Sequence, residues 1–229
     1  FDVTCLGSHV VRGLPNGAEA PGNHKLLRVD VAEGPHIVDI GLGNLTPTVP
    51  LALRLDEVQA TPHGFYRFVP HGSEFMLQTR IGGAWNDLFY FSLEPMPAAI
   101  FETANRFTST ASGSPFLANL IVASPVAGGR ATLYNRRFTL RHGNSVAERR
   151  ILAGAADYRD ILVGYFGLPL GDGELAAIAA KMASHATDEA VHPGFEVVDA
   201  PAGAEARPAE TADPFGADAG FGIQDRVVV

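Results

Sequence analysis

The first half of the chain alternates short apolar runs with clusters of turn residues. These clusters stand at 14–17, 33–35, 61–64 and 81–83, and each contains Gly or Pro. The runs between them, beginning with FDVTCLGSHVV, have the length and alternation of β-strands. Short strands at this even spacing are typical of an antiparallel barrel or sandwich. We therefore expect residues 1–97 to form an antiparallel β-barrel.

The pattern changes after residue 97 and predicts a smaller α/β unit. Residues 98–106 contain few helix breakers, so a connecting helix and loop are expected over 98–114. The following unit, 115–185, predicts two strands and then two helices, over 116–123, 130–140, 155–165 and 174–184. Asp172 is a suitable cap near the start of the second helix. We expect this unit to be a small α/β lid.

The composition shifts sharply at about residue 186. Residues 186–229 contain 9 acidic and 2 basic side chains, a net −7, whereas the whole chain has a formal charge of −8. The segment is rich in Ala, Pro and Gly, and it offers too little apolar area to offset the entropy lost on ordering. We expect 186–229 to be an acidic, mostly disordered tail.

Composition narrows the classes of function further. The chain has 229 residues and is 46% hydrophobic, which is enough to bury one substantial core. It shows no basic face that would neutralise a phosphate backbone and no apolar run long enough to span a membrane, so we expect neither nucleic acid nor membrane as a partner. A single cysteine excludes an internal disulfide, and we expect a cytoplasmic location, no metal site and no tightly bound cofactor.

Candidate chemistry concentrates in residues 24–50, where a histidine and a carboxylate stand on two strand-like runs joined by a Gly-Pro turn. His24 is a candidate general base, and Asp39 is a candidate to orient and charge-stabilise its imidazole. A hairpin centred on Glu33 and Gly34 leaves Asp39 on the same face as His24 but four residues away, about 13 Å at about 3.3 Å per residue. Twist or a β-bulge is then needed to bring the two side chains together.

Three motifs in this order resemble the arylamine N-acetyltransferases. The chain has HKLLRV at His24, VDIGLG at Val38 and LTPTVPLAL at Leu45, where the family pattern is His-x-x-L-L-V, V-D-V-G-F-G and L-T-P-T-x-P-L-x-L. The likeness continues through WNDLFYFSLEP at Trp85 and ERRILAGAADYRDILVGYFGLPL at Glu148. The resemblance implies an α+β fold: an antiparallel β-barrel followed by a small α/β lid, as the C-terminal part of a papain-like (cysteine proteinase-like) fold.

The resemblance also implies a mechanism. A cysteine takes acetyl from acetyl-CoA and passes it to the nitrogen of an arylamine or arylhydrazine in a ping-pong reaction, with His24 and Asp39 completing a Cys-His-Asp triad. The family's cysteine stands in an Arg-Gly-Gly-x-Cys motif on an N-terminal helical domain, and this motif does not occur in the sequence. Cys5 is better explained as a buried small hydrophobe on the opening strand. We therefore expect a fragment that lacks the catalytic-cysteine domain and does not acetylate arylamines alone.

The family pattern further suggests which residues meet the substrates. Small or polar residues expected near the entry of acetyl-CoA are Asn23, Gly43, Thr108, Ser109 and Ser114. Leu42 replaces the phenylalanine of V-D-V-G-F-G and so loses a flat wall for an arylamine ring. Phe116 is expected either in the substrate pocket or in the core.

Other interpretations of the charged residues and of the function stay open. The arginines around the predicted second strand, Arg130, Arg136, Arg137 and Arg141, could attract cofactor phosphates but are more simply a solvated face. The protein could also be a noncatalytic binding module that retains the barrel. An amide synthase with the same triad is a third possibility, which Leu42 mildly favours. The coding sequence before Phe1 would distinguish an arylamine N-acetyltransferase from a noncatalytic binding module. An acyl-donor screen would identify an amide synthase.

Overall fold

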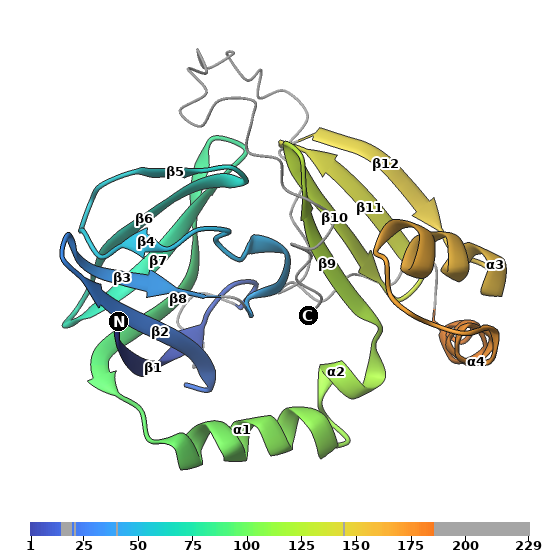
Figure 1. Cartoon of the computed structure of the whole chain (residues 1–229), viewed down its shortest axis with the longest axis horizontal. Helices are drawn as coiled ribbons and strands as arrows, with labels where there is room; N and C mark the ends of the chain where they lie inside the picture. Colours follow the sequence, from blue (N-terminus) through green and yellow to red (C-terminus); the bar gives the residue numbers. More distant parts are fainter. Residues whose placement is uncertain (15–19, 21, 40, 144, 186–229) are drawn as a thin grey trace.

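An antiparallel barrel and a smaller sheet make up the described part of the protein. The computed structural model describes residues 1–14, 20, 22–39, 41–143 and 145–185. Figure 1 shows an eight-stranded sheet curled into a barrel, with a four-stranded sheet standing beside it. Helices α3 and α4 lie on the side of the second sheet away from the barrel. The tail predicted for 186–229 lies outside the described residues, and the predicted domain limits stay predictions.

The barrel strands follow the order β4-β3-β2-β1-β8-β7-β6-β5. Their bounds are β1 Asp2–Val10, β2 His24–Val31, β3 Gly34–Val38, β4 Leu51–Ala52, β5 Gln59–Thr61, β6 Gly64–His71, β7 Glu74–Ile81 and β8 Ala84–Pro95. All neighbouring pairs in this sheet are antiparallel, as the turn spacing predicted.

The barrel core is built from the apolar face of each strand. On β6 and β8 the fully buried side chains are largely aromatic, and the ring centroids of Phe68 and Phe91 lie 5.9 Å apart in an edge-to-face contact. Each such aromatic stabilises the fold by about 1.5–3 kcal/mol through the apolar area it removes from water. On β1 it is Leu6 that enters the core, so Cys5 points the other way and is half-buried. The prediction that Cys5 is a buried small hydrophobe was wrong, because the inward face of β1 is the one that carries Leu6 and leaves Cys5 partly exposed.

Helix α1 (Ala98–Thr110) connects the two sheets and is longer than predicted. It is followed by the single turn α2 (Pro115–Ala118), whose start is fixed by Pro115 in the first turn and by Ser114, which accepts a hydrogen bond from the Phe116 amide at 3.3 Å. Phe116 is therefore helical and not in a strand, which corrects the predicted strand over 116–123.

The second sheet has the order β12-β11-β10-β9 and carries helices on one side. Its elements are β9 Ile121–Val126, β10 Gly129–Tyr134, β11 Arg137–His142, β12 Ser145–Ile151, α3 Ala155–Tyr158, the π-helical η2 Arg159–Tyr165 and α4 Asp172–Met182. The strand predicted over 130–140 is in fact a hairpin, and β12 was not predicted. Asn135 makes the tight turn in the left-handed region at φ 53°, a conformation that Asn tolerates without Gly or Pro.

Apolar side chains join the second sheet to its helices. This contact forms a core separate from that of the barrel. In it, Phe138 of β11 packs with Tyr158 of α3, Leu162 of η2 and Phe166, which directly follows η2. Burial raises the pKa of Tyr158 to about 12. Among the described residues, no helix is long and apolar enough to cross a membrane.

Candidate active site

His24 and Asp39 meet at one end of the β2–β3 hairpin. Nε2 of His24 lies 3.1 Å from Oδ1 of Asp39, within the distance expected for a triad. Within the described part of the chain this nitrogen has no well-aligned hydrogen bond, so the atoms are close while the N–H direction misses the oxygen. Because Nε2 faces Asp39, Nδ1 is the nitrogen left for a nucleophile.

The register of the hairpin explains how the two side chains meet. The turn contains only two residues, so Val31 pairs with Gly34 and Leu27 with Val38. Continuing this register places Asp39 opposite Leu26, two residues from His24 on the same face. The predicted gap of four residues was wrong because the hairpin is centred one residue earlier than expected, and no bulge is needed.

Asp39 is held in place by its own backbone. It is 5% exposed, and its Oδ1 accepts the Gly41 amide hydrogen at 2.8 Å, an Asx-type turn just after β3. The ring of Phe89 packs against the imidazole of His24, with 5.7 Å between the two ring centroids, and so restricts its rotation.

A cavity of about 930 Å³ opens beside His24. It lies between the barrel, α1, α2 and the second sheet, and six predicted site residues besides His24 line it: Asn23, Leu42, Gly43, Thr108, Ser109 and Phe116. Ser114 does not line it. This side chain is 1% exposed, and its hydroxyl donates to the Thr108 carbonyl at 2.6 Å while capping α2, so its position is explained by local structure.

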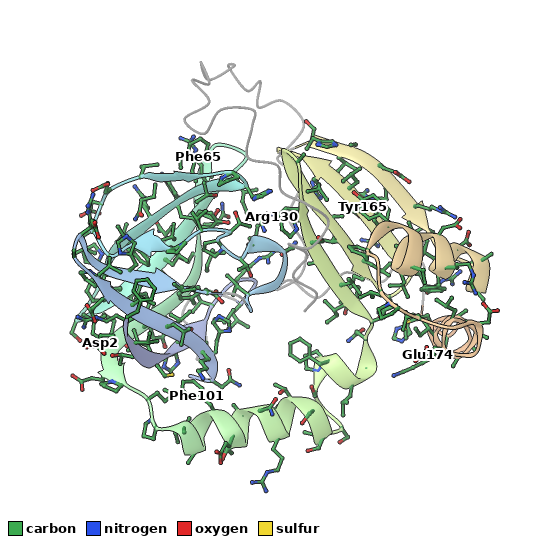
Figure 2. The ribbon with its side chains drawn as sticks, viewed as in Figure 1. Asp2, Phe65, Phe101, Arg130, Tyr165 and Glu174 are labelled. Carbon is green, nitrogen blue, oxygen red and sulfur yellow. The ribbon has the colours of Figure 1, made fainter. Side chains whose placement is uncertain are left out.

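Several residues that line the cavity were not predicted. Phe101 of α1 supplies an aromatic surface, and the ammonium of Lys25 lies 5.2 Å from the centre of its ring. Figure 2 shows Phe101 on the helix that runs beneath the barrel. Arg12 donates to the side-chain oxygen of Asn44 at 2.7 Å, and both line the cavity close to Gly43. Their sequence neighbourhood gave no signal of this contact, because 32 positions separate the two residues.

A buried polar network supports the turn that follows Asp39. Arg130 of β10 lies between the two sheets (Figure 2). It donates to the Thr46 carbonyl at 3.0 Å and to the Tyr66 hydroxyl at 2.9 Å, and Tyr66 donates to the Leu45 carbonyl at 3.1 Å. These bonds fix η1 (Gly43–Leu45), which carries part of the cavity wall.

Burial shifts the titration of this network. It lowers the pKa of Arg130 and, together with the charge of Arg130, lowers the pKa of Arg12 to about 10. Burial raises the pKa of Tyr66, and the charge of Arg130 opposes that change. Arg130 and Arg141 are at most 9% exposed, so the prediction that these arginines form a solvated face was wrong for them. Arginines at alternate positions also occur on a strand whose second face packs against another part of the protein.

Cys5, the single cysteine of the chain, does not line the cavity. It stands on β1 opposite Leu27, on the outward face, whereas Ser8 on the inward face is the residue paired with His24. Among the described residues, no group of three His, Cys, Asp or Glu side chains is close enough to hold a metal ion.

Comparison with known proteins identifies the family. The profile described as N-acetyltransferase matches residues 1–175. The chain is 34% identical over 175 residues to the arylamine N-acetyltransferase of Mycolicibacterium smegmatis, covering 75% of this chain and 63% of that enzyme. It is 31% identical over 193 residues to the arylamine N-acetyltransferase / N-hydroxyarylamine O-acetyltransferase of Salmonella typhimurium, covering 81% of this chain and 68% of the relative.

Solved structures agree with this assignment. The Salmonella typhimurium arylamine N-acetyltransferase superposes with a TM-score of 0.71 at 31% identity, over 79% of this chain and 68% of the other. The Mycobacterium marinum enzyme in complex with CoA gives a TM-score of 0.72 at 31% identity, over 79% and 69%. The chain belongs to the arylamine N-acetyltransferase family, and it spans less than two thirds of the M. smegmatis relative.

Proposed function

We propose that this chain carries the histidine and aspartate of a Cys-His-Asp site, and that the protein transfers acetyl from acetyl-CoA to the nitrogen of arylamines or arylhydrazines. The observation that supports this most strongly is the 3.1 Å approach of His24 Nε2 to buried Asp39 at the edge of a cavity of about 930 Å³. The family to which the chain belongs supports the reaction class.

His24 acts as base and then as acid in this proposal. Its Nδ1 takes the proton of a cysteine thiol, and the thiolate attacks the thioester carbonyl of acetyl-CoA. The thiol of CoA leaves with the proton from the imidazolium. The amine then attacks the acetyl-cysteine, loses its proton and restores the free cysteine. Asp39 stabilises the imidazolium in both halves of the cycle.

The nucleophile comes from outside this chain in our proposal, because Cys5 lies away from the cavity. We infer a papain-like arrangement in which a segment bearing the cysteine packs beside Nδ1 of His24. Polar Asn23 precedes His24 in the chain and lines the same cavity as Gly43, whose lack of a side chain leaves room for the thioester end of acetyl-CoA. The hydroxyls of Thr108 and Ser109 donate to backbone carbonyls of α1. These residues therefore leave space for a ligand in the cavity but do not donate a hydrogen bond to it.

The acceptor side of the cavity differs from the family pattern at Leu42. Phe101 and Phe116 still offer aromatic surface to an arylamine from α1 and α2. We expect an acceptor preference that depends on these two rings. An acyl-donor and amine screen on the complete gene product tests the proposal. N-acetylation of an arylamine supports it, and transfer of longer acyl chains alone would instead favour an amide synthase.

A further inference from the structure

A lysine ammonium reaches the cavity close to the proposed catalytic histidine. Lys25 directly follows His24 on β2, and both residues line the cavity. Side chains of neighbouring strand residues leave the strand on opposite faces, so the ammonium and the imidazole approach the cavity from different sides. The residue paired with Lys25 on β1 is Gly7, so β1 places no side chain opposite the lysine at this pair. The two functional groups are therefore held at different points of the cavity wall.

The lysine ammonium lies beside an aromatic ring. Nζ of Lys25 is 5.2 Å from the ring centre of Phe101, which stands near the start of α1 (Figure 2). Within the described part of the chain, the ammonium has this cation–π contact and no ion pair. A cation–π contact is weak where water reaches the cation, and the side chain of Lys25 is exposed. The ammonium therefore keeps its capacity to bind an anion.

The cavity lining does not supply that anion. No Asp or Glu is among the described residues that line the cavity. The other cations of the lining are Arg12, Arg137, Arg141 and Arg149, and each of them already takes part in interactions of its own. Lys25 is therefore the cation of this lining whose charge meets only a ring among the described residues.

Building on the proposed transfer to arylamines, we propose that Lys25 and Phe101 select acceptors that carry a carboxylate on the aromatic ring. The amino group of the acceptor lies toward His24, its ring packs along Phe101, and its carboxylate accepts a hydrogen bond from the Lys25 ammonium. A hydrogen bond between opposite charges is stronger than a cation–π contact that water reaches. A neutral acceptor of the same shape gains no such bond, and a cationic acceptor is repelled.

The placement of the two groups explains why the ring matters. Because the imidazole and the ammonium approach the cavity from different sides, one ligand meets both only if its amine and its anion stand apart. A rigid ring with these substituents at opposite ends satisfies this requirement without losing conformational entropy on binding.

A matched pair of acceptors tests this proposal. The molecules para-aminobenzoate and para-aminobenzamide have the same ring and nearly the same shape, but only the first is charged. Calorimetry on the complete gene product without acetyl-CoA gives the Kd of each, and an acetylation assay gives each kcat/KM. We expect both measurements to favour the acid by roughly tenfold, as one charge-assisted hydrogen bond provides. Lys25→Met should abolish this preference, whereas Lys25→Arg should retain most of it, because it keeps the charge.

Arg54→Met is the control for the loss of one positive charge. Arg54 is exposed, pairs with Glu57 and does not line the cavity, so its replacement should leave the preference for the acid unchanged. Where only the acetylated protein binds an acceptor, the ratio of the kcat/KM values decides alone.

Three results would overturn the proposal: equal treatment of acid and amide by the unaltered protein, a preference that survives in Lys25→Met, and neither binding nor turnover of the acid. Selective binding of the acid that depends on Lys25 but leads to no acetylation would contradict the proposed function and support this inference. Acetylation without any preference for the acid would do the reverse.

Discussion

Arg130 of β10 donates a hydrogen bond to the hydroxyl of Tyr66 on β6, with 2.9 Å between the two atoms. The two residues are 64 positions apart and join the second sheet to the barrel beneath the turn that follows Asp39. Within the described part of the chain, Arg130 has no carboxylate partner, and carbonyl and phenol oxygens satisfy its guanidinium instead. The Tyr66 hydroxyl is therefore a required acceptor for a buried charge.

Tyr66→Phe is expected to lower the free energy of unfolding by about 1–3 kcal/mol, because it removes one of the acceptors of the buried Arg130 and the donor to the Leu45 carbonyl. Chemical denaturation measures this. Tyr90→Phe is the control, since the ring of Tyr90 stacks on His9 and is kept, and its cost should stay below about 0.5 kcal/mol. Equal costs for the two variants would contradict the role of the Tyr66 hydroxyl.

His63 makes the stability of the protein sensitive to acid. Its Nδ1 lies 2.8 Å from the Thr48 hydroxyl and its Nε2 lies 3.0 Å from the Val126 carbonyl, so the neutral ring accepts from one and donates to the other. Burial and then the charge of Arg130 lower the pKa of His63 below its ordinary value of 6.5.

The sign of the pH effect follows from this direction. Below about pH 6.5 the unfolded chain takes up a proton at His63 before the folded protein does, so stability is complete above that pH and falls as the pH drops. The melting temperature should fall between about pH 7.5 and about pH 5.5 in the unaltered protein, and it should fall less in the His63→Gln variant. Glutamine keeps a donor and an acceptor at this position but does not titrate. An identical fall in both proteins would mean that other groups cause the acid sensitivity.

Gly129 is required by a close backbone approach in the second sheet. A Cβ added there would collide with the backbone carbonyl of Arg141 on the neighbouring strand. Gly129→Ala should therefore cost about 1–3 kcal/mol, as overpacking does elsewhere. Gly113→Ala is a matched control because a Cβ there meets nothing within 4 Å, and it should change stability by less than about 0.5 kcal/mol. A similar small effect at both positions in thermal unfolding would contradict the predicted clash.

The barrel was predictable because its strands are short, alternate in polarity and are divided by Gly and Pro. The second sheet was less so. The Asn135 turn lacks both residues, and β12 (Ser145–Ile151) is mostly exposed, so neither a breaker nor an apolar face marks them. Phe116 was assigned to a strand because the cap formed by Ser114 and Pro115 was overlooked.

The site was predicted in identity but not in geometry. His24 and Asp39 were found by type and by family pattern, yet a one-residue error in the hairpin centre doubled their expected separation along the strand. Sequence alone does not distinguish an arginine that faces solvent from one that faces another sheet. Arg130 was therefore missed as a buried residue, because only the packing of β10 against the barrel decides its environment.

The 229-residue chain alone should not acetylate an arylamine above background, and Cys5→Ala should change nothing. The reason is that Cys5 stands on the outward face of β1, away from His24 and the cavity. A colorimetric assay for loss of the free amine measures this. Turnover that Cys5→Ala abolishes would show that Cys5 is the nucleophile.

Acetyl-cysteine formation tests the role of His24 and Asp39 most directly. The complete gene product is mixed with acetyl-CoA and analysed by intact mass and peptide mapping. We expect one acetyl group on a cysteine other than Cys5, formed on the order of 10²-fold or more slowly in His24→Gln and in Asp39→Asn. Acetylation at an unchanged rate in both variants would contradict the proposed triad.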